Sequence, residues 1–230
     1  MVKNNKKSLF DRFSIKIQKK FSKPEYGKRW PEQTIEWYKK IHDDNYLIHE
    51  HFKKYLASKN DVKTVLEIGC GKGIYPIFNK KLFENMEYIG IDISPSAIDY
   101  CKENSEFTFI CDDFIKMKLD KKFDMIYSHA VVDHVYDIDA FISKIIDKTN
   151  HYAYINSYRG YFPNLKSHKM KWDGYEACYF NNLSVEQIKK LLSKKGLSES
   201  EYEIYSQKSG QKDENVDLQT IIEINKKDVN

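Results

Sequence analysis

The sequence has few of the features that mark secreted, zinc-binding or membrane-spanning proteins. Its 230 residues include only four cysteines, with no Cys-x-x-Cys pair and no histidines at zinc-finger spacing. We therefore expect reduced thiols in a cytoplasmic protein. No run approaches the roughly 18 apolar residues of a membrane span, and the N-terminus lacks the apolar core of a secretory signal. These absences predict a soluble chain.

The positive charge is confined to one end of the chain. Residues 1–30 carry ten Lys or Arg against two acidic residues, a net charge of +8. Because the whole chain has a formal net charge of +4, residues 31–230 carry −4. A negative body repels a phosphate backbone, so the composition argues against a nucleic-acid substrate.

The basic end of the chain is predicted to be helical. In residues 8–23, four apolar side chains recur at spacings of three and four and form one stripe between lysines: Phe10, Phe13, Ile17 and Phe21. Such a helix packs on its own domain or contacts an anionic membrane surface, and both alternatives stay open. A second helical region covers about residues 31–57. We expect residues 1–60 to form a basic helical extension.

From residue 61 onward, short apolar runs alternate with helical segments. The runs predicted as strands cover residues 62–68, 86–93, 106–112, 123–129 and 151–158, and a helix at 184–196 precedes a hairpin of 201–207 with 218–225. Alternation of this kind is typical of an α/β fold with a doubly wound, mostly parallel sheet that is covered on both faces. Residues 61–230 are thus expected to form one domain, whereas the oligomeric state stays open.

The strand ends carry glycines and acidic residues. Residues 67–73 read Glu-Ile-Gly-Cys-Gly-Lys-Gly, Asp92 ends the second strand, and Asp112-Asp113-Phe114 follows the third. Ligands of parallel sheets bind at the carboxyl ends of the strands, and glycines let the backbone approach a ligand closely. Asp92 is placed to accept hydrogen bonds from ribose hydroxyls. Several acids around one pocket favour a sulfonium and an ammonium over a pyrophosphate.

Four segments resemble those of the class I S-adenosylmethionine-dependent methyltransferases, closest to their small-molecule (type 11 or 25) branch. The segments are VLEIGCGKG, YIGIDISPSAIDYCKEN, FTFICDDF and FDMIYSHAVVDHVYDIDAFI, and the resemblance covers about residues 62–158. It implies a Rossmann-like, seven-stranded sheet in the order 3-2-1-4-5-7-6 with the last strand antiparallel. It also implies S-adenosylmethionine as the cofactor. A nicotinamide-binding oxidoreductase fits less well, because Ile74 stands where its GxGxxG motif needs the last glycine.

The resemblance implies cofactor contacts at Glu67, Gly69, Cys70, Gly71, Gly73, Asp92, Ile93, Asp112, Asp113, Phe114 and Ser128. The glycines would line the methionine and ribose, with Glu67 behind their loop near the amino group. Asp92 would hold the ribose hydroxyls, and Asp113 or Asp112 would contact the adenine amino group.

Candidate catalytic residues follow the fourth strand. His134 titrates near neutral pH and could deprotonate an acceptor, and a packing or capping role is its alternative. His129 is expected beside the methionine part, and Asp133 could orient either histidine or act as the base. Some related methyltransferases bind magnesium here through an ExxEH arrangement, but Ala130 occupies the place of its first acid, so no metal is expected.

Substrate contacts are expected from segments that flank the core. Residues 157–183 form a long aromatic stretch that carries Arg159 and Trp172 and reads as a lid or substrate wall, or equally as a cover for a sheet edge. Trp30, together with Arg29, could close over the carboxylate of the cofactor.

The sequence thus predicts methyl transfer to oxygen or nitrogen of a small molecule or glycan. One alternative is a binding or scaffold protein that keeps the fold without catalysis. Another is a nucleic-acid methyltransferase, but the Asn/Asp-Pro-Pro-aromatic motif of that class is missing and HAVVDHV stands in its place.

Overall fold

The computed structural model describes residues 23–30, 34–36, 38–39, 47–209 and 218–227. Apart from Lys23, the predicted basic helix at 8–23 lies outside these residues and stays a prediction. Much of the second helical region, residues 31–33, 37 and 40–46, also lies outside them. Its last part forms α3 (Leu47–Ala57).

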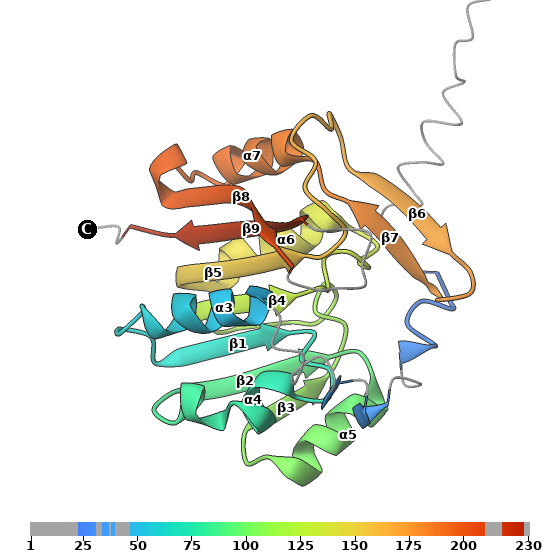
Figure 1. The fold of residues 1–230 in the computed structure, drawn as a ribbon, viewed down its shortest axis with the longest axis vertical. Helices are drawn as coiled ribbons and strands as arrows, with labels where there is room; N and C mark the ends of the chain where they lie inside the picture. The colour runs from blue at the N-terminus through green and yellow to red at the C-terminus, as the bar shows by residue number, and fades with distance from the viewer. Residues whose placement is uncertain (1–22, 31–33, 37, 40–46, 210–217, 228–230) are drawn as a thin grey trace, which may run out of the picture.

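The centre of the fold is a seven-stranded sheet in the order β3-β2-β1-β4-β5-β9-β8 (Figure 1). The strands are β1 (Thr64–Ile68), β2 (Glu87–Asp92), β3 (Thr108–Cys111), β4 (Phe123–His129), β5 (Thr149–Ser157), β8 (Tyr202–Lys208) and β9 (Leu218–Asn225). The first five pair in parallel, whereas β9 runs antiparallel to both β5 and β8. With β8 and β9 as the sixth and seventh strands, the predicted order and the antiparallel last strand are confirmed.

Helices cover both faces of this sheet. The buried residues of α3, α4 (Ile74–Phe78), η2 (Lys80–Phe83) and α5 (Pro95–Asn104) form one apolar cluster with the sheet. Those of α6 (Ile138–Lys148) and α7 (Val185–Lys194) belong to a second cluster, and a short η3 (Glu199–Glu201) precedes β8. Asp137 and Ser184 cap α6 and α7 by accepting hydrogen bonds from backbone N–H groups. The doubly wound fold is thus confirmed.

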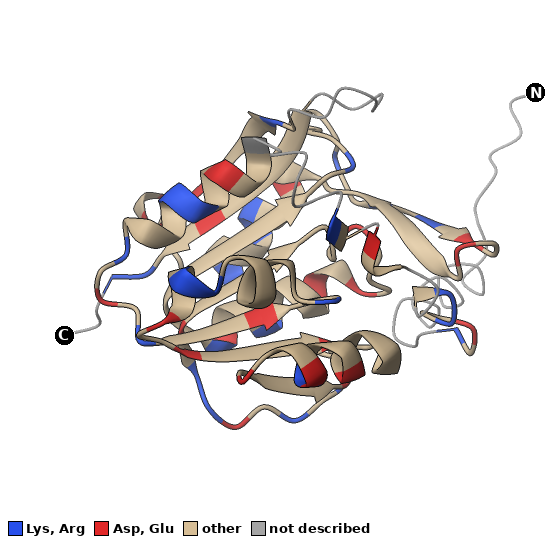
Figure 2. Ribbon diagram, turned by 60° about the horizontal axis from the view of Figure 1, so that its bottom comes forward, with Lys and Arg blue, Asp and Glu red and all other residues tan. Residues whose placement is uncertain are grey.

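Charged side chains of both signs are spread over these elements. Figure 2 shows Lys and Arg interspersed with Asp and Glu along the ribbon rather than gathered on one face. Within the described ranges, every helix is too short or too polar to cross a membrane.

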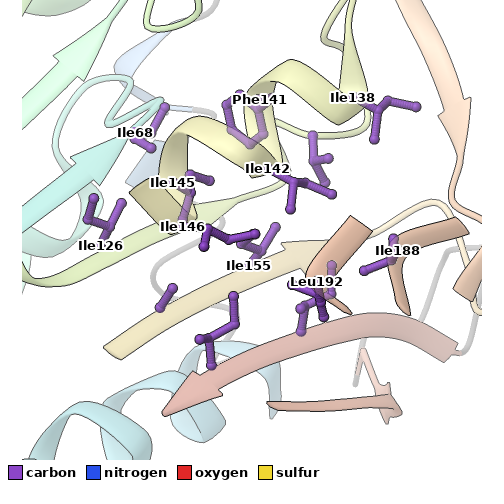
Figure 3. Packing of buried hydrophobic residues seen from close by; sticks show 14 of the residues in the cluster. Ile68, Ile126, Ile138, Phe141, Ile142, Ile145, Ile146, Ile155, Ile188 and Leu192 are labelled. Atoms are coloured by element: carbon purple, nitrogen blue, oxygen red, sulfur yellow. The ribbon is translucent and has the colours of Figure 1, made fainter. Parts of the chain in front are cut away.

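Branched aliphatic residues fix the sheet against α6 and α7. On α6 the buried positions Ile138, Phe141, Ile142, Ile145 and Ile146 recur at helical spacing and point to the sheet (Figure 3). Full burial of such a side chain stabilises the fold by about 1.5–3 kcal/mol. The strand ends that carry the site are therefore held by a well-packed core.

The stretch of residues 157–183 contains a second, two-stranded sheet. In it, β6 (Lys169–Asp173) pairs antiparallel with β7 (Cys178–Asn182). The fully buried Asn181 ties β7 to the loop after β4, because its side-chain amide donates to the carbonyls of Val132 and Val135 at 2.9 and 2.8 Å. Residues 23–30 lie beside the tip of this hairpin (Figure 1), where Gly27 N–H donates to the carbonyl of Ala177 at 2.8 Å.

Candidate functional site

A cavity of about 510 Å³ lies at the carboxyl ends of the central parallel strands. Most of the predicted site residues line it: Trp30, Glu67, Gly69, Cys70, Gly71, Asp92, Ile93, Asp112, Asp113, Phe114, His129 and His134. The strands β1 to β4 therefore bring their terminal residues together, as the sequence predicted.

The loop after β1 passes through a space that admits no side chain. Gly69 and Gly71 have φ angles of +75° and +52°, a region that favours glycine. A Cβ atom at Gly69 would lie 2.1 Å from the side chain of Val131, and one at Gly71 would lie 2.6 Å from Tyr38. Gly73 does not line the cavity. It stands at the start of α4, where a Cβ atom would meet Ile77 at 2.8 Å and Cys101 at 3.2 Å, so its role is in the turn.

Asp92 joins the glycine loop to the start of α5. Its two carboxylate oxygens accept the backbone N–H groups of Gly71 and Ser94, both at 2.8 Å. Burial raises the pKa of Asp92, and these backbone hydrogen bonds oppose that shift. The carboxylate is thus fixed beside the loop at the cavity wall.

Two further acids follow β3. Asp113 accepts the hydroxyl of Tyr136 and the backbone N–H of Ile115, each at 3.0 Å. The neighbouring Asp112 is exposed and accepts the backbone N–H of Asp113 at 2.7 Å. Phe114 is buried with its ring centroid 5.6 Å from that of Phe141 and lines the apolar part of the cavity.

Glu67 is the most deeply buried acid of the cavity wall, with 4% of its surface exposed. The hydroxyls of Tyr88 and Tyr127 both donate to one of its carboxylate oxygens, that of Tyr127 at 2.8 Å. Burial raises the pKa of Glu67 to about 7; the two phenols oppose the shift and the nearby Asp92 adds to it.

The cavity is rich in acids and poor in cations. Five carboxyl groups line it, from Glu67, Asp92, Asp112, Asp113 and Glu176, and among the described residues no Lys or Arg does. Opposite charges attract strongly where water is scarce. These negatively charged hydrogen-bond acceptors fit S-adenosylmethionine, which carries a sulfonium, an ammonium and a ribose diol.

His129, at the end of β4, lies in an aromatic wall. Its ring centroid is 4.7 Å from that of Phe52 and 5.4 Å from that of Tyr154, and its Nε2 is 3.3 Å from the hydroxyl of Tyr75. Burial lowers the pKa of His129 well below its ordinary value. The ring thus forms part of the pocket wall, and its predicted direct role in catalysis stays a prediction. Its neighbour Ser128 is fully buried and does not line the cavity, and the predicted cofactor contact there stays a prediction.

Asp133 is fully buried and hydrogen-bonds to the segment that follows β5. It accepts the hydroxyl of Ser157 at 2.6 Å and the backbone N–H groups of Tyr158 and Arg159 at 3.2 and 3.3 Å. Asp133 does not line the cavity, and its predicted role as the base stays a prediction. In the structure its carboxylate joins the loop after β4 to the end of β5.

Arg159 and Trp172 shape the hairpin rather than the cavity surface. The guanidinium of Arg159 stacks 4.6 Å from the ring centroid of Phe180, and Trp172 packs between Tyr179 and the ammonium of Lys23. Neither lines the cavity, and their predicted substrate contacts stay predictions. Arg29 stacks on Tyr175 at 4.2 Å and donates to its carbonyl, and it likewise does not line the cavity.

Several lining residues were missed by the sequence analysis. Tyr26 packs edge-on against Trp30 and Tyr136 at 5.1 and 5.2 Å, and Phe180 lies on β7. Tyr158 follows the end of β5, so the strand-end rule applied to the first four strands would have found it at the fifth. The other two reach the cavity through contacts between distant segments, for which the sequence carries no signal.

Comparison with known proteins identifies the family to which the chain is similar. The family described as "Methyltransferase domain" matches residues 59–197. "Putative methyltransferase 235L" of Invertebrate iridescent virus 6 is 29% identical over 191 residues, covering 75% of this chain and 64% of that protein. A malonyl-[acyl-carrier protein] O-methyltransferase of Bacillus cytotoxicus is 32% identical over 103 residues, covering 44% and 35%. The chain therefore spans less than two thirds of the length of these relatives.

Solved structures share the fold. The plantazolicin methyltransferase BpumL in complex with S-adenosylhomocysteine (SAH) has a TM-score of 0.61 at 17% identity, with 95% of this chain and 98% of that one covered. The magnesium protoporphyrin IX methyltransferase of Synechocystis PCC 6803 has a TM-score of 0.53 at 16% identity, with 77% of each chain covered. Since the family match covers more than half of the sequence and the fold agrees, the chain belongs to the S-adenosylmethionine-dependent methyltransferases of the Rossmann-like class.

Proposed function

We propose that this chain transfers the methyl group of S-adenosylmethionine to an oxygen or nitrogen atom of a small molecule or glycan. The observation that carries the proposal is the convergence of Glu67, Asp92 and Asp113, from the ends of three neighbouring strands, on one cavity. These carboxyl groups suit a ligand with two positive centres and a ribose diol.

Different lining residues would bind the ribose, adenine and methionine parts of the cofactor. Asp92 would hold the ribose hydroxyls, and Asp112 or Asp113 would accept from the adenine amino group, with Ile93 and Phe114 as apolar neighbours of the ring. The glycine loop lets backbone groups approach the methionine part closely. When bound, the cofactor supplies an activated methyl group, so the chain itself needs to align the acceptor and remove a proton.

The relatives differ in their acceptors. Their names include a malonyl-[acyl-carrier protein] O-methyltransferase and a probable (S)-tetrahydroprotoberberine N-methyltransferase 2 of Papaver bracteatum, so oxygen and nitrogen acceptors both occur among them. A nucleic-acid acceptor would call for a basic face, whereas Lys and Arg are interspersed with acids on the described part (Figure 2).

Calorimetry with S-adenosylmethionine and SAH tests the proposal. We expect binding at one site per chain. Asp92→Ala should weaken it at least a hundredfold, because two charge-assisted hydrogen bonds to the ribose contribute about 1.5–3 kcal/mol each. The control Asp99→Ala, at an exposed position of α5, should stay within about twofold. Absence of heat from the wild type at millimolar cofactor would contradict the proposal, and binding without SAH formation from any acceptor would favour the scaffold alternative.

A further inference from the structure

Tyr158 and His134 form a hydrogen-bonded pair at the cavity surface. Tyr158 directly follows β5, and its hydroxyl lies 3.2 Å from Nε2 of His134, in the loop after β4. Both side chains line the cavity, and their ring centroids are 5.7 Å apart.

The surroundings of His134 fix which ring nitrogen carries the hydrogen. Nδ1 lies 3.0 Å from the backbone carbonyl of Tyr179, and a carbonyl oxygen can only accept. Nδ1 therefore carries the hydrogen, and Nε2 presents its lone pair to Tyr158. The thiol of Cys178 lies 3.4 Å from the same Nδ1, and burial raises its pKa to about 11, so it stays neutral.

The direction of the second hydrogen bond follows from the first. Because Nε2 accepts, the hydroxyl of Tyr158 must donate to it. The phenol oxygen also accepts from the Arg159 side chain, and its remaining lone pair is left for the acceptor. Burial lowers the pKa of His134, with the Tyr179 carbonyl opposing this shift and the Arg159 guanidinium adding to it, so the ring is neutral at pH 7 and its Nε2 keeps the lone pair.

Three elements hold this pair in place. Asp133 accepts the backbone N–H of Tyr158, and the backbone carbonyl of Asp133 accepts from Asn181 of β7 at 2.8 Å. The ring of Phe180, also on β7, lies 5.7 Å from that of His134. The phenol is therefore presented to the cavity by buried contacts from β5, β7 and the loop after β4.

We propose that Tyr158 is the catalytic residue that receives the proton of the acceptor, and that His134 is the destination of the proton rather than the group that touches the acceptor. This proposal rests on the methyltransferase function proposed above. As the acceptor atom takes the methyl group, the carbon–sulfur electron pair stays on sulfur. The acceptor proton passes to the phenol oxygen of Tyr158 while the phenol proton passes to Nε2 of His134. His134 ends as an imidazolium, which later releases its proton to water.

The same arrangement restricts the class of acceptor. A carboxylate is already an anionic nucleophile and needs no base, so it would leave the relay unused. An acceptor that carries an O–H or N–H group uses the relay. The apolar side chains of Trp30, Val131 and Phe180 in the lining suit a hydroxyl, phenol or amine on an apolar body.

The tautomer of His134 can be measured without knowing the acceptor. In protein labelled with ¹⁵N-histidine, we expect the His134 signals, assigned with His134→Gln, to show the neutral Nδ1–H form at pH 7. The Nε2–H form would overturn the proposal, because Nε2 could then not take up a proton. Cofactor binding is measured separately by calorimetry, so failure of the relay is distinguishable from failure of the methyltransferase function.

Turnover tests the roles of the two residues. SAH formation is followed with three probes, a catechol, an arylalkylamine and a malonyl thioester, and we expect turnover with the first or second and none with the third. Tyr158→Phe should lower kcat about a hundredfold or more with cofactor affinity within twofold, and the double variant with His134→Gln should be no slower than the slower single variant. Tyr161→Phe, outside the cavity lining, is the matched control and should keep wild-type turnover.

Two kinetic results would overturn the proposal. One is a kcat of Tyr158→Phe within threefold of the wild type. The other is methylation of the malonyl thioester in preference to the other probes. If no probe is turned over, the tautomer measurement decides.

Discussion

One side of the cavity is made by the ends of neighbouring parallel strands, whereas the opposite side is made by segments that meet only in the folded chain. The strand-end side contains Glu67, the glycine loop, Asp92 and Asp113. The cover side contains Tyr26, Trp30, Cys178 and Phe180. The first is fixed by sheet register and backbone hydrogen bonds. The second depends on contacts such as that between Gly27 and Ala177, 150 residues apart in the chain.

This difference separates two tasks. A cofactor common to a large family can be bound by the part of the fold that sheet pairing dictates. An acceptor that differs between relatives needs walls that change without disturbing the sheet, and residues 23–30 with the β6–β7 hairpin have that freedom.

The largest effect is expected on the strand-end side, from Glu67→Gln. The pKa of Glu67 is about 7 in the folded chain and ordinarily 4.5, so the folded state binds this proton more tightly. The stabilisation that protonated Glu67 gives to the folded state is fully present below pH 4.5 and is lost as the pH rises through 7. Glutamine does not ionise. From pH 4.5 to 7.5, the free energy of unfolding of the variant should therefore fall by about 3 kcal/mol less than that of the wild type. Urea unfolding of cofactor-free protein from pH 4.5 to 7.5 measures this.

A second buried acid and a control variant help to interpret this unfolding measurement. Burial also raises the pKa of Asp133 to about 7, so part of the pH dependence should remain in the variant. Glu106→Gln, at a side chain that is 90% exposed, should follow the wild type. Parallel curves for wild type and Glu67→Gln would show that the strand-end side is not the dry, well-packed wall described here.

A smaller effect is expected on the cover side, from Tyr26→Ala. The ring of Tyr26 packs against Trp30 and against Tyr136, which donates to Asp113. Its loss should weaken cofactor binding about tenfold, or about 1.4 kcal/mol, measured by calorimetry. Tyr175→Ala, at a side chain that is 71% exposed on the hairpin, should change affinity less than threefold. An equal loss of cofactor affinity in the two variants would contradict the assignment of Tyr26 to the cavity lining.

The sequence predicted the strand-end side because its signals are local. Each strand is a short apolar run, and the residue after it must lie at the carboxyl edge of the sheet, which placed Glu67, Asp92 and Asp113 together. The same rule does not say which way a side chain points. Ser128 and Asp133 lie in the expected segments, but their side chains are buried away from the cavity.

The cover side was not predictable in the same way. Nothing in the aromatic composition of residues 157–183 reveals that Trp172 packs on Tyr179 while Phe180 lines the cavity. Arg159 was predicted to contact the substrate, whereas its guanidinium stacks on Phe180 and does not line the cavity. Such outcomes are set by hairpin register and by docking on the loop after β4, and both depend on long-range contacts.

A crystal structure of the chain with bound SAH tests the central claim most directly. The account predicts the ribose hydroxyls on Asp92, the adenine between Ile93 and Phe114 with its amino group at Asp112 or Asp113, and the homocysteine part along the loop from Gly69 to Gly71. The sulfur should face the part of the cavity that Tyr158 and His134 line. A nucleoside bound elsewhere, or bound here with its ribose away from Asp92, would contradict the account.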